Sequence, residues 1–261
     1  TSLLASQPGN QQLESMVKRV ENFRPGLSQL VDEIVVAETK TISLTVNALN
    51  HSTVEVDQRL VPAGLWRSVN ARALFFYIID KGKAKKEDIS LEFWPDFSQA
   101  KITSNFHTTM WRIRKMIGDR EAIAFTDGFY HLDPAIQLTY DVNEFEKLLA
   151  ETKKPRIEPE DLRSRLSRAV SLYKSDFIPD ISMEWAEYRR NSLRLQYLDA
   201  LITLAKLEYQ EGKFRQVEVL YEKAISIDPY NDEFHLALMK NYLAMGTPAA
   251  AKAHYRTYVK V

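Results

Sequence analysis

A set of residues recurs at a fixed interval in the C-terminal half of this chain, and that interval strongly restricts the fold. The recurring residues are a Leu, a Gly, a small apolar residue and a Tyr, found as Leu204, Gly212, Val217 and Tyr221 and again, 34 positions later, as Leu238, Gly246, Ala251 and Tyr255. This interval is typical of stacked helix pairs, in which each pair buries its apolar face against the next. Glycine suits the turn between the helices of a pair. The end of the chain is therefore predicted to be an all-α array.

Helical patterns precede the repeat from residue 141 onward. Asp141, followed three residues later by Glu144, predicts an N-cap with a capping box. Further helices are expected over residues 159–173 and 183–211. Two copies of a 34-residue tetratricopeptide unit are fewer than the roughly three that such arrays need, so these helices are expected to complete the stack. Residues 141–261 are predicted to form one tetratricopeptide-like helical repeat domain.

The first half of the chain has a different period. Apolar and polar residues alternate from Ile42 to Val46 and again over residues 53–56, which predicts a small antiparallel sheet. Helical spacing follows over three segments, residues 69–81, 86–93 and 101–117. Asp127-Gly128 then lies between two β-prone runs, the combination best suited to a type I′ hairpin. Sheet, three helices and hairpin, in this order, predict an α+β winged helix over residues 41–140.

The third helix of this series, at residues 101–118, has one apolar stripe and one polar, basic face. The stripe consists of Ile102, Phe106, Met110, Ile113 and Ile117. Between residues 101 and 120 there are five Lys/Arg and one acid, a local charge of +4. Such a helix suits the major groove of DNA. An ordinary surface helix with solvated charges has the same pattern, so the neighbouring elements decide the interpretation.

Composition restricts the remaining functions. The length of 261 residues suggests two domains, and 35 Lys/Arg balance 35 Asp/Glu, so any nucleic acid must be bound by a local patch. The sequence contains no cysteine, which excludes disulfides and thiolate chemistry and fits a reducing cytoplasm. No apolar run approaches the roughly 18 residues of a membrane span, so no membrane partner is expected.

Enzyme motifs are also missing from the sequence. The five histidines show no metal-ligand spacing, and no Gly-Lys pair has the flanking residues of a phosphate-binding loop. The acid pairs Glu87-Asp88 and Asp232-Glu233 lie at expected helix starts, where acids are common. We therefore expect no catalytic activity, no cofactor and no bound metal.

Residues 1–40 are expected to be a separate helical extension, with short amphipathic patterns over residues 13–20 and 27–35. These helices either cap the next domain or remain from an upstream domain. The chain begins with Thr1 rather than Met and stops within an expected helix, so we expect a fragment of a longer protein.

Short motifs throughout the chain match one family of bacterial regulators. In the first half they are Ala71-Arg72-Ala73-Leu74, Phe93-Trp94-Pro95-Asp96, Asn105-Phe106, Arg112-Ile113-Arg114 and Gly128-Phe129-Tyr130-His131-Leu132. In the second half they are Trp185-Ala186-Glu187-Tyr188-Arg189, Glu211-Gly212-Lys213-Phe214, Asp228-Pro229 and Leu238-Met239 through Gly246. With these motifs, residues 42–261 resemble an OmpR-type winged helix followed by a bacterial transcriptional activator domain. This pairing is that of the Streptomyces antibiotic regulatory protein family.

The resemblance implies a transcriptional activator that binds double-stranded DNA as a homodimer of side-by-side copies. It also implies that the helical domain makes dimer or partner contacts, and that RNA polymerase is a further partner through the loop at residues 95–100. By position, the implied DNA contacts are Lys101, Ser104, Thr108, Trp111, Arg112 and Lys115 in the third helix and Thr126 and Tyr130 in the hairpin.

Two observations, the charge balance of the first half and the acid in the hairpin, keep a second hypothesis open, a protein–protein interaction module whose winged helix no longer binds DNA. Residues 41–150 contain 13 Lys/Arg and 14 Asp/Glu, a net charge of −1, whereas strong DNA-binding domains are basic. Asp127 lies in the hairpin where relatives more often have Gly or a basic residue. Trp111 is a large aromatic on the proposed groove face, a kind of residue that another domain often covers.

Other basic residues of the first half have two interpretations. The cluster Lys81, Lys83, Lys85 and Lys86 either contacts phosphates or is a solvated loop. Arg112 either contacts DNA or pairs with an acid such as Glu87. Arg114 lies nearer the flank of its helix, where a structural role is expected.

Overall fold

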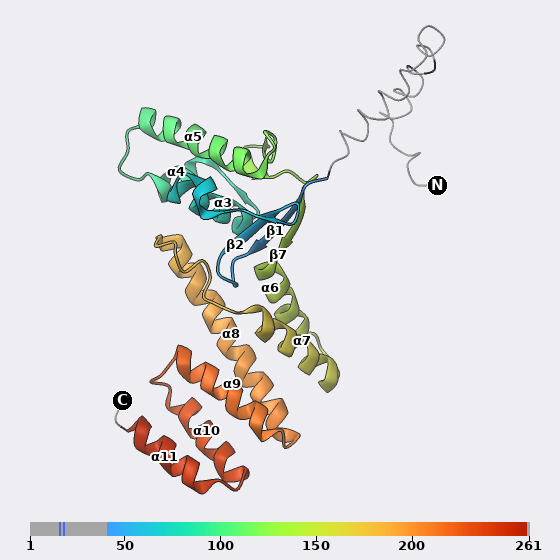
Figure 1. Cartoon of the computed structure of the whole chain (residues 1–261), viewed down its shortest axis with the longest axis vertical. Helices are drawn as coiled ribbons and strands as arrows, with labels where there is room; N and C mark the ends of the chain where they lie inside the picture. Colours follow the sequence, from blue (N-terminus) through green and yellow to red (C-terminus); the bar gives the residue numbers. More distant parts are fainter. Residues whose placement is uncertain (1–15, 17, 19–40, 260–261) are drawn as a thin grey trace. The chain divides into compact units, whose positions relative to one another are not determined.

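The structure, a computed structural model, describes residues 41–259 together with Met16 and Lys18 (Figure 1). The chain divides into two units, residues 1–42 and 43–261. The amphipathic segments expected over residues 13–20 and 27–35 lie outside the described residues, apart from Met16 and Lys18.

A four-stranded sheet opens the second unit. It has the order β3-β2-β1-β7 and consists of β1 (Ser43–Asn47), β2 (Thr53–Val56), β3 (Arg59–Leu60) and β7 (Gln137–Tyr140). Leu44 of β1 lies opposite Val56 of antiparallel β2 and opposite Leu138 of parallel β7. Leu44 and Val46 are fully buried, which confirms the alternating pattern. The pattern did not predict β7, because this strand pairs with a segment far away in the sequence.

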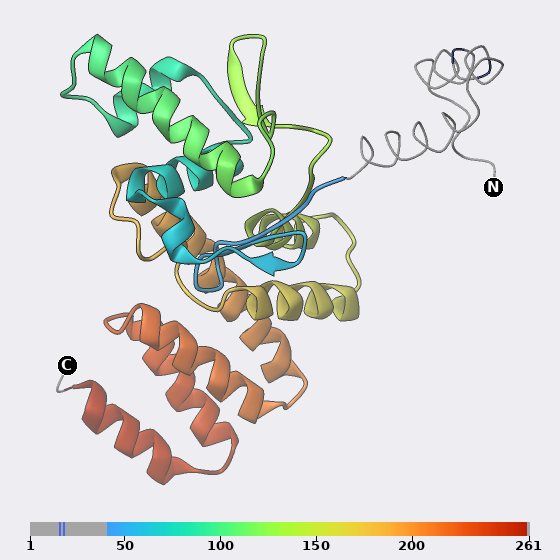
Figure 2. The same cartoon turned by 45° about the horizontal axis from the view of Figure 1, so that its top comes forward.

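Three helices follow and confirm the expected segments: α3 (Val69–Lys81), α4 (Lys86–Phe93) and α5 (Gln99–Ile117). A 3-10 turn, η1 (Ala63–Trp66), precedes α3. The Ser68 hydroxyl caps α3 by accepting a hydrogen bond from Ala71 N at 3.4 Å. Phe75, Phe76 and Ile78 of α3 are fully buried, so this helix forms the centre of the core, and α5 packs against it (Figure 2).

A small second sheet accompanies α5. Its order is β4-β6-β5, with β4 (Lys83–Ala84), β5 (Ile123–Thr126) and β6 (Phe129–Leu132). Between β5 and β6, Asp127 has φ 53° and Gly128 has φ 85°. Positive φ at both positions defines a type I′ turn, so the predicted hairpin is confirmed. The segment expected as a basic loop instead contributes β4, with Lys83 opposite His131 of β6.

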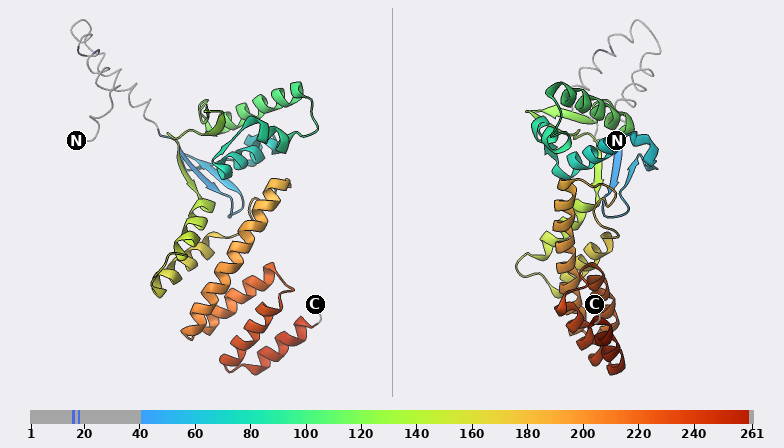
Figure 3. Two further views of the ribbon diagram at one scale, coloured as in Figure 1. Left: turned by 180° about the vertical axis from the view of Figure 1, so that it is seen from behind. Right: turned by 90° about the vertical axis from the view of Figure 1, so that its left-hand side faces the viewer.

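The C-terminal half, from residue 141 onward, contains six helices and no strand within its described residues. It consists of α6 (Asp141–Thr152), α7 (Pro159–Leu172), α8 (Glu184–Gln210), α9 (Phe214–Ile227), α10 (Asp232–Ala244) and α11 (Pro248–Tyr258). Each helix packs against the next, and α8 to α11 form a row in Figure 3. Gly212 with φ 72° and Gly246 with φ 70° form the turns after α8 and α10. Left-handed backbone favours glycine, which explains why this residue recurs.

The expected role of Asp141 as an N-cap is wrong. The N-cap of α6 is Tyr140, and Asp141 is the first residue of the helix. Its carboxylate accepts hydrogen bonds from the backbone N–H groups of Ala48 and Leu49, both at 2.8 Å. Buried backbone donors need an acceptor, and the turn after β1 receives one from α6. Glu144 forms no capping box; it pairs with Arg168 of α7.

Candidate nucleic-acid interface

The outward face of α5 carries an unbroken row of polar and aromatic side chains. The exposed members of this row are Lys101, Ser104, Thr108, Trp111 and Lys115. They lie three or four residues apart, so they share one face of the helix. The opposite stripe is buried and consists of Phe106, Thr109, Met110, Ile113 and Ile117. Five of the six DNA contacts implied on this helix are therefore exposed together, and the sixth, Arg112, is half-buried at the edge of the row.

Trp111 forms the centre of the C-terminal part of this row. It is 53% exposed, so no other described part of the chain covers it. The Lys115 ammonium lies 4.9 Å from the centroid of the Trp111 ring, within cation–π range. Beside them is a small hollow of about 80 Å³, lined by Leu65, Arg67, Trp111, Arg112, Lys115 and Met116. Arg67, at the end of η1, thus joins two cations of α5, a position that the sequence pattern did not reveal.

The charges of this face are not neutralised by neighbouring acids. Among the described residues, Lys101, Arg112 and Lys115 form no ion pair, and the alternative pairing of Arg112 with Glu87 does not occur. Arg114, by contrast, donates hydrogen bonds from Nε and Nη2 to the Ile123 carbonyl at 3.2 and 2.6 Å. The expected structural role of Arg114 is confirmed, because it ties α5 to the first strand of the hairpin.

The hairpin supplies one exposed and one half-buried candidate. Thr126 is exposed beside the turn, whereas the Tyr130 ring packs against Phe106 at 4.9 Å and against Phe125 at 4.6 Å. Burial raises the pKa of Tyr130. Phe125 is 58% exposed next to Thr126, and no sequence signal had selected it. The outer surface of the hairpin is thus formed by Thr126 and Phe125, and Tyr130 supports it from behind.

Two lysines of the basic cluster, Lys83 and Lys85, lie against this hairpin rather than in a free loop, whereas Lys81 ends α3 and Lys86 begins α4. The Lys83 and Lys85 ammonium groups lie 4.7 and 5.4 Å from the Phe129 ring centroid, and that of Lys86 lies 5.4 Å from the Phe106 centroid. Cation–π contacts of this kind hold the amines near the hairpin without removing their charge. They add positive charge beside α5.

An ion-pair cluster connects α3 to the helical half. Arg189 of α8 donates from Nε to Asp80 at 3.0 Å and from its two terminal nitrogens to Glu146 at 2.8 and 2.9 Å. The Tyr140 hydroxyl donates to Asp80 at 3.0 Å. Burial raises the pKa of Asp80, and the charge of Arg189 opposes that rise. Nearby, the Tyr77 and Trp185 rings meet edge to face at 5.2 Å.

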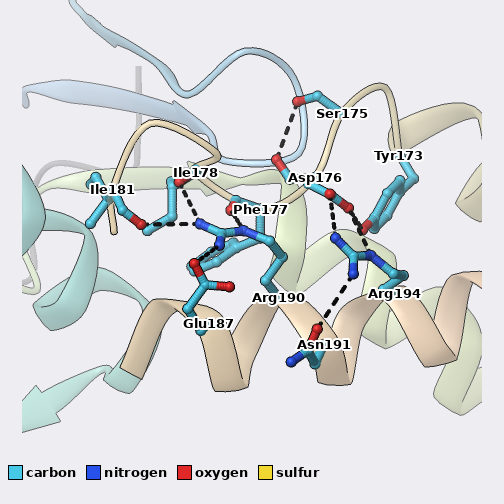
Figure 4. A network of polar contacts seen from close by, with 10 residues as sticks. All are labelled: Tyr173, Ser175, Asp176, Phe177, Ile178, Ile181, Glu187, Arg190, Asn191 and Arg194. Carbon is cyan, nitrogen blue, oxygen red and sulfur yellow. Dashed lines mark hydrogen bonds and ion pairs between the residues drawn. The ribbon is translucent and has the colours of Figure 1, made fainter. Parts of the chain in front are cut away.

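The connection between α7 and α8 is held by two arginines of α8 (Figure 4). Arg190 is buried and donates to three backbone carbonyls at 2.9 to 3.1 Å, those of Phe177, Ile178 and Ile181. Arg194 pairs with Asp176 at 2.5 Å. Ile178 N in turn donates to the Ala48 carbonyl at 3.1 Å. These contacts link the first sheet, α3 and the helices α6–α8.

Within the described residues, no group of three or more His, Cys, Asp or Glu side chains is placed to hold a metal ion. Glu87 and Asp88 lie in the first turn of α4, and Asp232 and Glu233 lie in the first turn of α10. Acids in these positions face the positive ends of helix dipoles. Among the helices of the described ranges, none is long and apolar enough to cross a membrane.

Comparison with protein families gives a match in the C-terminal half of the chain. Residues 140–261 match the model of the bacterial transcriptional activator domain. This part of the chain is therefore similar to that domain. A search of curated proteins gives no significant match.

A solved structure is similar over more of the chain. Mycobacterium tuberculosis EmbR, in complex with a low-affinity phosphopeptide, is similar with a TM-score of 0.63 and 16% sequence identity. The similarity covers 83% of this chain and 58% of that chain, so this chain spans a little over half of the length of EmbR. The likeness concerns the fold, a small N-terminal sheet region followed by the helices α3 to α11.

Proposed function

We propose that this chain is a DNA-binding transcriptional regulator that reads duplex DNA with α5. The observation that carries the proposal is the exposed row of α5, in which free cations alternate with hydroxyl groups and one indole. An α-helix fits the major groove, where Lys and Arg recognise guanine and hydroxyl groups accept or donate to either base type. The match of residues 140–261 to a transcriptional activator domain supports the same assignment.

In this proposal, residues 41–140 act as a winged helix. The row from Lys101 to Lys115 enters the major groove, and the half-buried Arg112 contacts a phosphate or a guanine edge. The hairpin lies over the adjacent backbone with Thr126 outermost, and Tyr130 holds its shape. Lys83 and Lys85 contribute positive charge at the hairpin, where phosphates are contacted.

Residues 141–261 are proposed to mediate contacts between two copies on DNA or with a protein partner. The charge balance of the first half supports a need for pairing, since a region with a net charge of −1 attracts DNA through its local patch alone. A single copy is expected to bind weakly, with a shallow salt dependence that reflects few phosphate contacts. The exposed loop at residues 95–100 is the proposed contact for RNA polymerase.

A second function, a protein interaction module without DNA binding, is favoured by one specific observation. Trp111 and Phe125 are both more than half exposed, and Asp127 adds a negative charge at the tip of the hairpin. Exposed aromatic side chains are common centres of protein interfaces. This module would use the same face with a protein in place of DNA.

Selection of duplexes from a random pool distinguishes the two functions. A DNA reader enriches a motif, and Arg112→Ala and Lys115→Ala each weaken binding to the selected duplex. Lys206→Ala provides the matched control, because Lys206 is an exposed lysine on α8, outside this face. A pool with no enriched motif, together with residual binding that is the same in all three variants, would rule out the DNA-reading function.

A further inference from the structure

A second concave site lies away from the row on α5. It is a cleft of about 610 Å³ between the turn before β2, the segment from β3 to the start of α3, and the connection before α8. Small-molecule sites in proteins typically measure roughly 300–1,000 Å³. None of the eight residues predicted to contact DNA lines this cleft. The cleft therefore needs an explanation of its own.

One wall of the cleft is apolar. Trp66 and Ile181 are buried in its lining, whereas Leu60 and Val69 are 61% and 71% exposed at its edges. Val61 lies between them. Apolar side chains in this arrangement suit the hydrocarbon part of a ligand, whose burial removes apolar surface from water.

The floor of the cleft contains a polar group with no partner. Ser52 lines the cleft and is 5% exposed, and its hydroxyl has no hydrogen-bond partner among the described residues. Buried polar atoms are nearly always hydrogen-bonded, so this hydroxyl, once it rotates toward the cleft, has an unused hydrogen bond for a polar atom supplied from outside. Ser52 both donates and accepts hydrogen bonds, which suits a carboxylate or hydroxyl oxygen.

The lining of the same cleft includes the start of α3 and two arginines, Arg67 and Arg72. The first turn of α3 contains no acidic residue; the Ser68 hydroxyl already accepts from Ala71 N, and the N–H groups of Val69 and Asn70 precede the first intrahelical hydrogen bond. The start of a helix carries a partial positive charge that attracts anions. Arg67 lines the cleft and forms no ion pair among the described residues. Arg72 pairs with Asp180 and donates to the Ser52 carbonyl at 2.7 Å, so the negative charge of Asp180 is already offset.

We propose that this cleft binds a small organic acid. The carboxylate lies at the start of α3, where it accepts hydrogen bonds from the Ser52 hydroxyl and from Arg67. The apolar body lies along Leu60, Val61 and Val69. Arg67 also lines the hollow beside Trp111, so the bound acid lies one side chain away from the face of α5. The proposal that this cleft binds an acid is independent of the proposed DNA-binding function. Only an effect of the bound acid on DNA binding would rest on that function.

Isothermal titration of the full chain with octanoate tests the site, with octanol and octylamine as probes that share the tail but lack the negative charge. Octanoate is expected to bind saturably with one site per chain. Arg67→Ala is expected to weaken octanoate binding about tenfold, the equivalent of one charge-assisted hydrogen bond. Ser52→Ala is expected to weaken it about threefold or more. Val69→Trp is expected to abolish binding by filling the cleft.

Two controls separate the site from general effects. Val219→Trp places the same side chain on an exposed valine of α9, and Lys174→Ala removes an exposed charge elsewhere. Both variants should bind octanoate as the unmodified chain does. Thermal unfolding without ligand shows whether the fold survives; Ser52→Ala should leave the melting temperature unchanged or raise it, because the hydroxyl it removes has no partner.

Three results would overturn the proposal. They are the absence of saturable binding for octanoate, decanoate and benzoate alike, equal affinity for octanol and octanoate, and octanoate binding that survives both Arg67→Ala and Val69→Trp. Because octanoate binding is measured without DNA, a failed duplex selection and a failed titration are separate outcomes.

Discussion

Arg189 of α8 donates a hydrogen bond from Nε to the Asp80 carboxylate of α3 at 3.0 Å, and this pair joins the two halves of the described unit. The Asp80 side chain is only 6% exposed. Removing the partner of a buried charge is costly because the remaining charge is left without compensation in a low-dielectric environment. The pair therefore holds α3, against which α5 packs, in a fixed relation to α8.

We expect Arg189→Ala to lower the free energy of unfolding by about 3–5 kcal/mol. Urea denaturation followed by circular dichroism measures this change. Arg168→Ala is the matched control, because Arg168 also pairs with a residue of α6 but is 67% exposed, and such pairs contribute about 1 kcal/mol or less. Equal losses in the two variants would show that the Asp80–Arg189 pair does not stabilise the junction.

The stability of the protein should depend on the ionisation of Asp141. Burial raises the pKa of this carboxyl from 3.8 to about 6, although backbone N–H donors favour its charged form. The unfolded chain loses the proton first as pH rises. The contribution of Asp141 is therefore fully present below pH 3.8 and is lost as pH rises to about 6.

The matched comparison is Asp141→Asn, which cannot ionise. Between about pH 4 and pH 6 the free energy of unfolding of the unmodified chain should fall relative to this variant, by at most about 3 kcal/mol. Urea titrations at several pH values measure the difference, and other titrating groups cancel in it. A difference that stays constant across this window would contradict the raised pKa.

The elements with strong local signals were predictable from the sequence. The apolar stripe of α5 and the Asp127-Gly128 turn depend on residues close together in the chain, and both have the predicted structure, except that Ile102 at the start of the stripe is only half-buried. Strands β4 and β7 were not predicted, because each consists of a short run that becomes a strand only by pairing with a distant partner. Asp141 was misassigned for a similar reason, since its hydrogen-bond donors lie 93 and 92 positions away.

In the candidate interface, too, some residues were predictable from local spacing and others were not. Helical spacing alone places the row from Lys101 to Lys115 on one face of α5. Arg67 and Phe125 join this surface from η1 and β5, and only tertiary packing brings them there. The inward packing of Tyr130 against Phe106 likewise depends on how the hairpin meets the helix. Local periodicity therefore predicted which side chains share the outer face of α5. The residues that surround this face could be identified only from the structure.

The acid at the tip of the hairpin can be tested by a single substitution. Asp127 has φ 53°, a left-handed conformation that Asp and Asn tolerate better than most residues, so its presence has a structural reason independent of DNA. We expect Asp127→Asn to keep the turn and, by removing one like charge near the phosphates, to tighten DNA binding about two- to fivefold at low salt.

Fluorescence anisotropy with the selected duplex, at low and high salt, measures this gain. Asp161→Asn is the control, because it removes an exposed acid from α7, outside the proposed interface. The gain should shrink as salt rises, since the repulsion is screened. Unchanged affinity at low salt would place the hairpin tip away from the phosphates.

Trp111 distinguishes the two proposed functions most directly. The indole is 53% exposed and carries Lys115 over its ring, so its removal takes away an apolar contact and frees the ammonium. We expect Trp111→Ala to leave the free energy of unfolding nearly unchanged, because an exposed side chain contributes little burial. If α5 reads DNA, binding to the selected duplex should weaken about tenfold, the size of one good base contact.

Tyr188→Ala removes a 70% exposed aromatic from α8 and is the matched control. If Trp111→Ala and Tyr188→Ala bind the duplex equally well, the indole does not contact DNA, and its exposure favours a protein partner on this face.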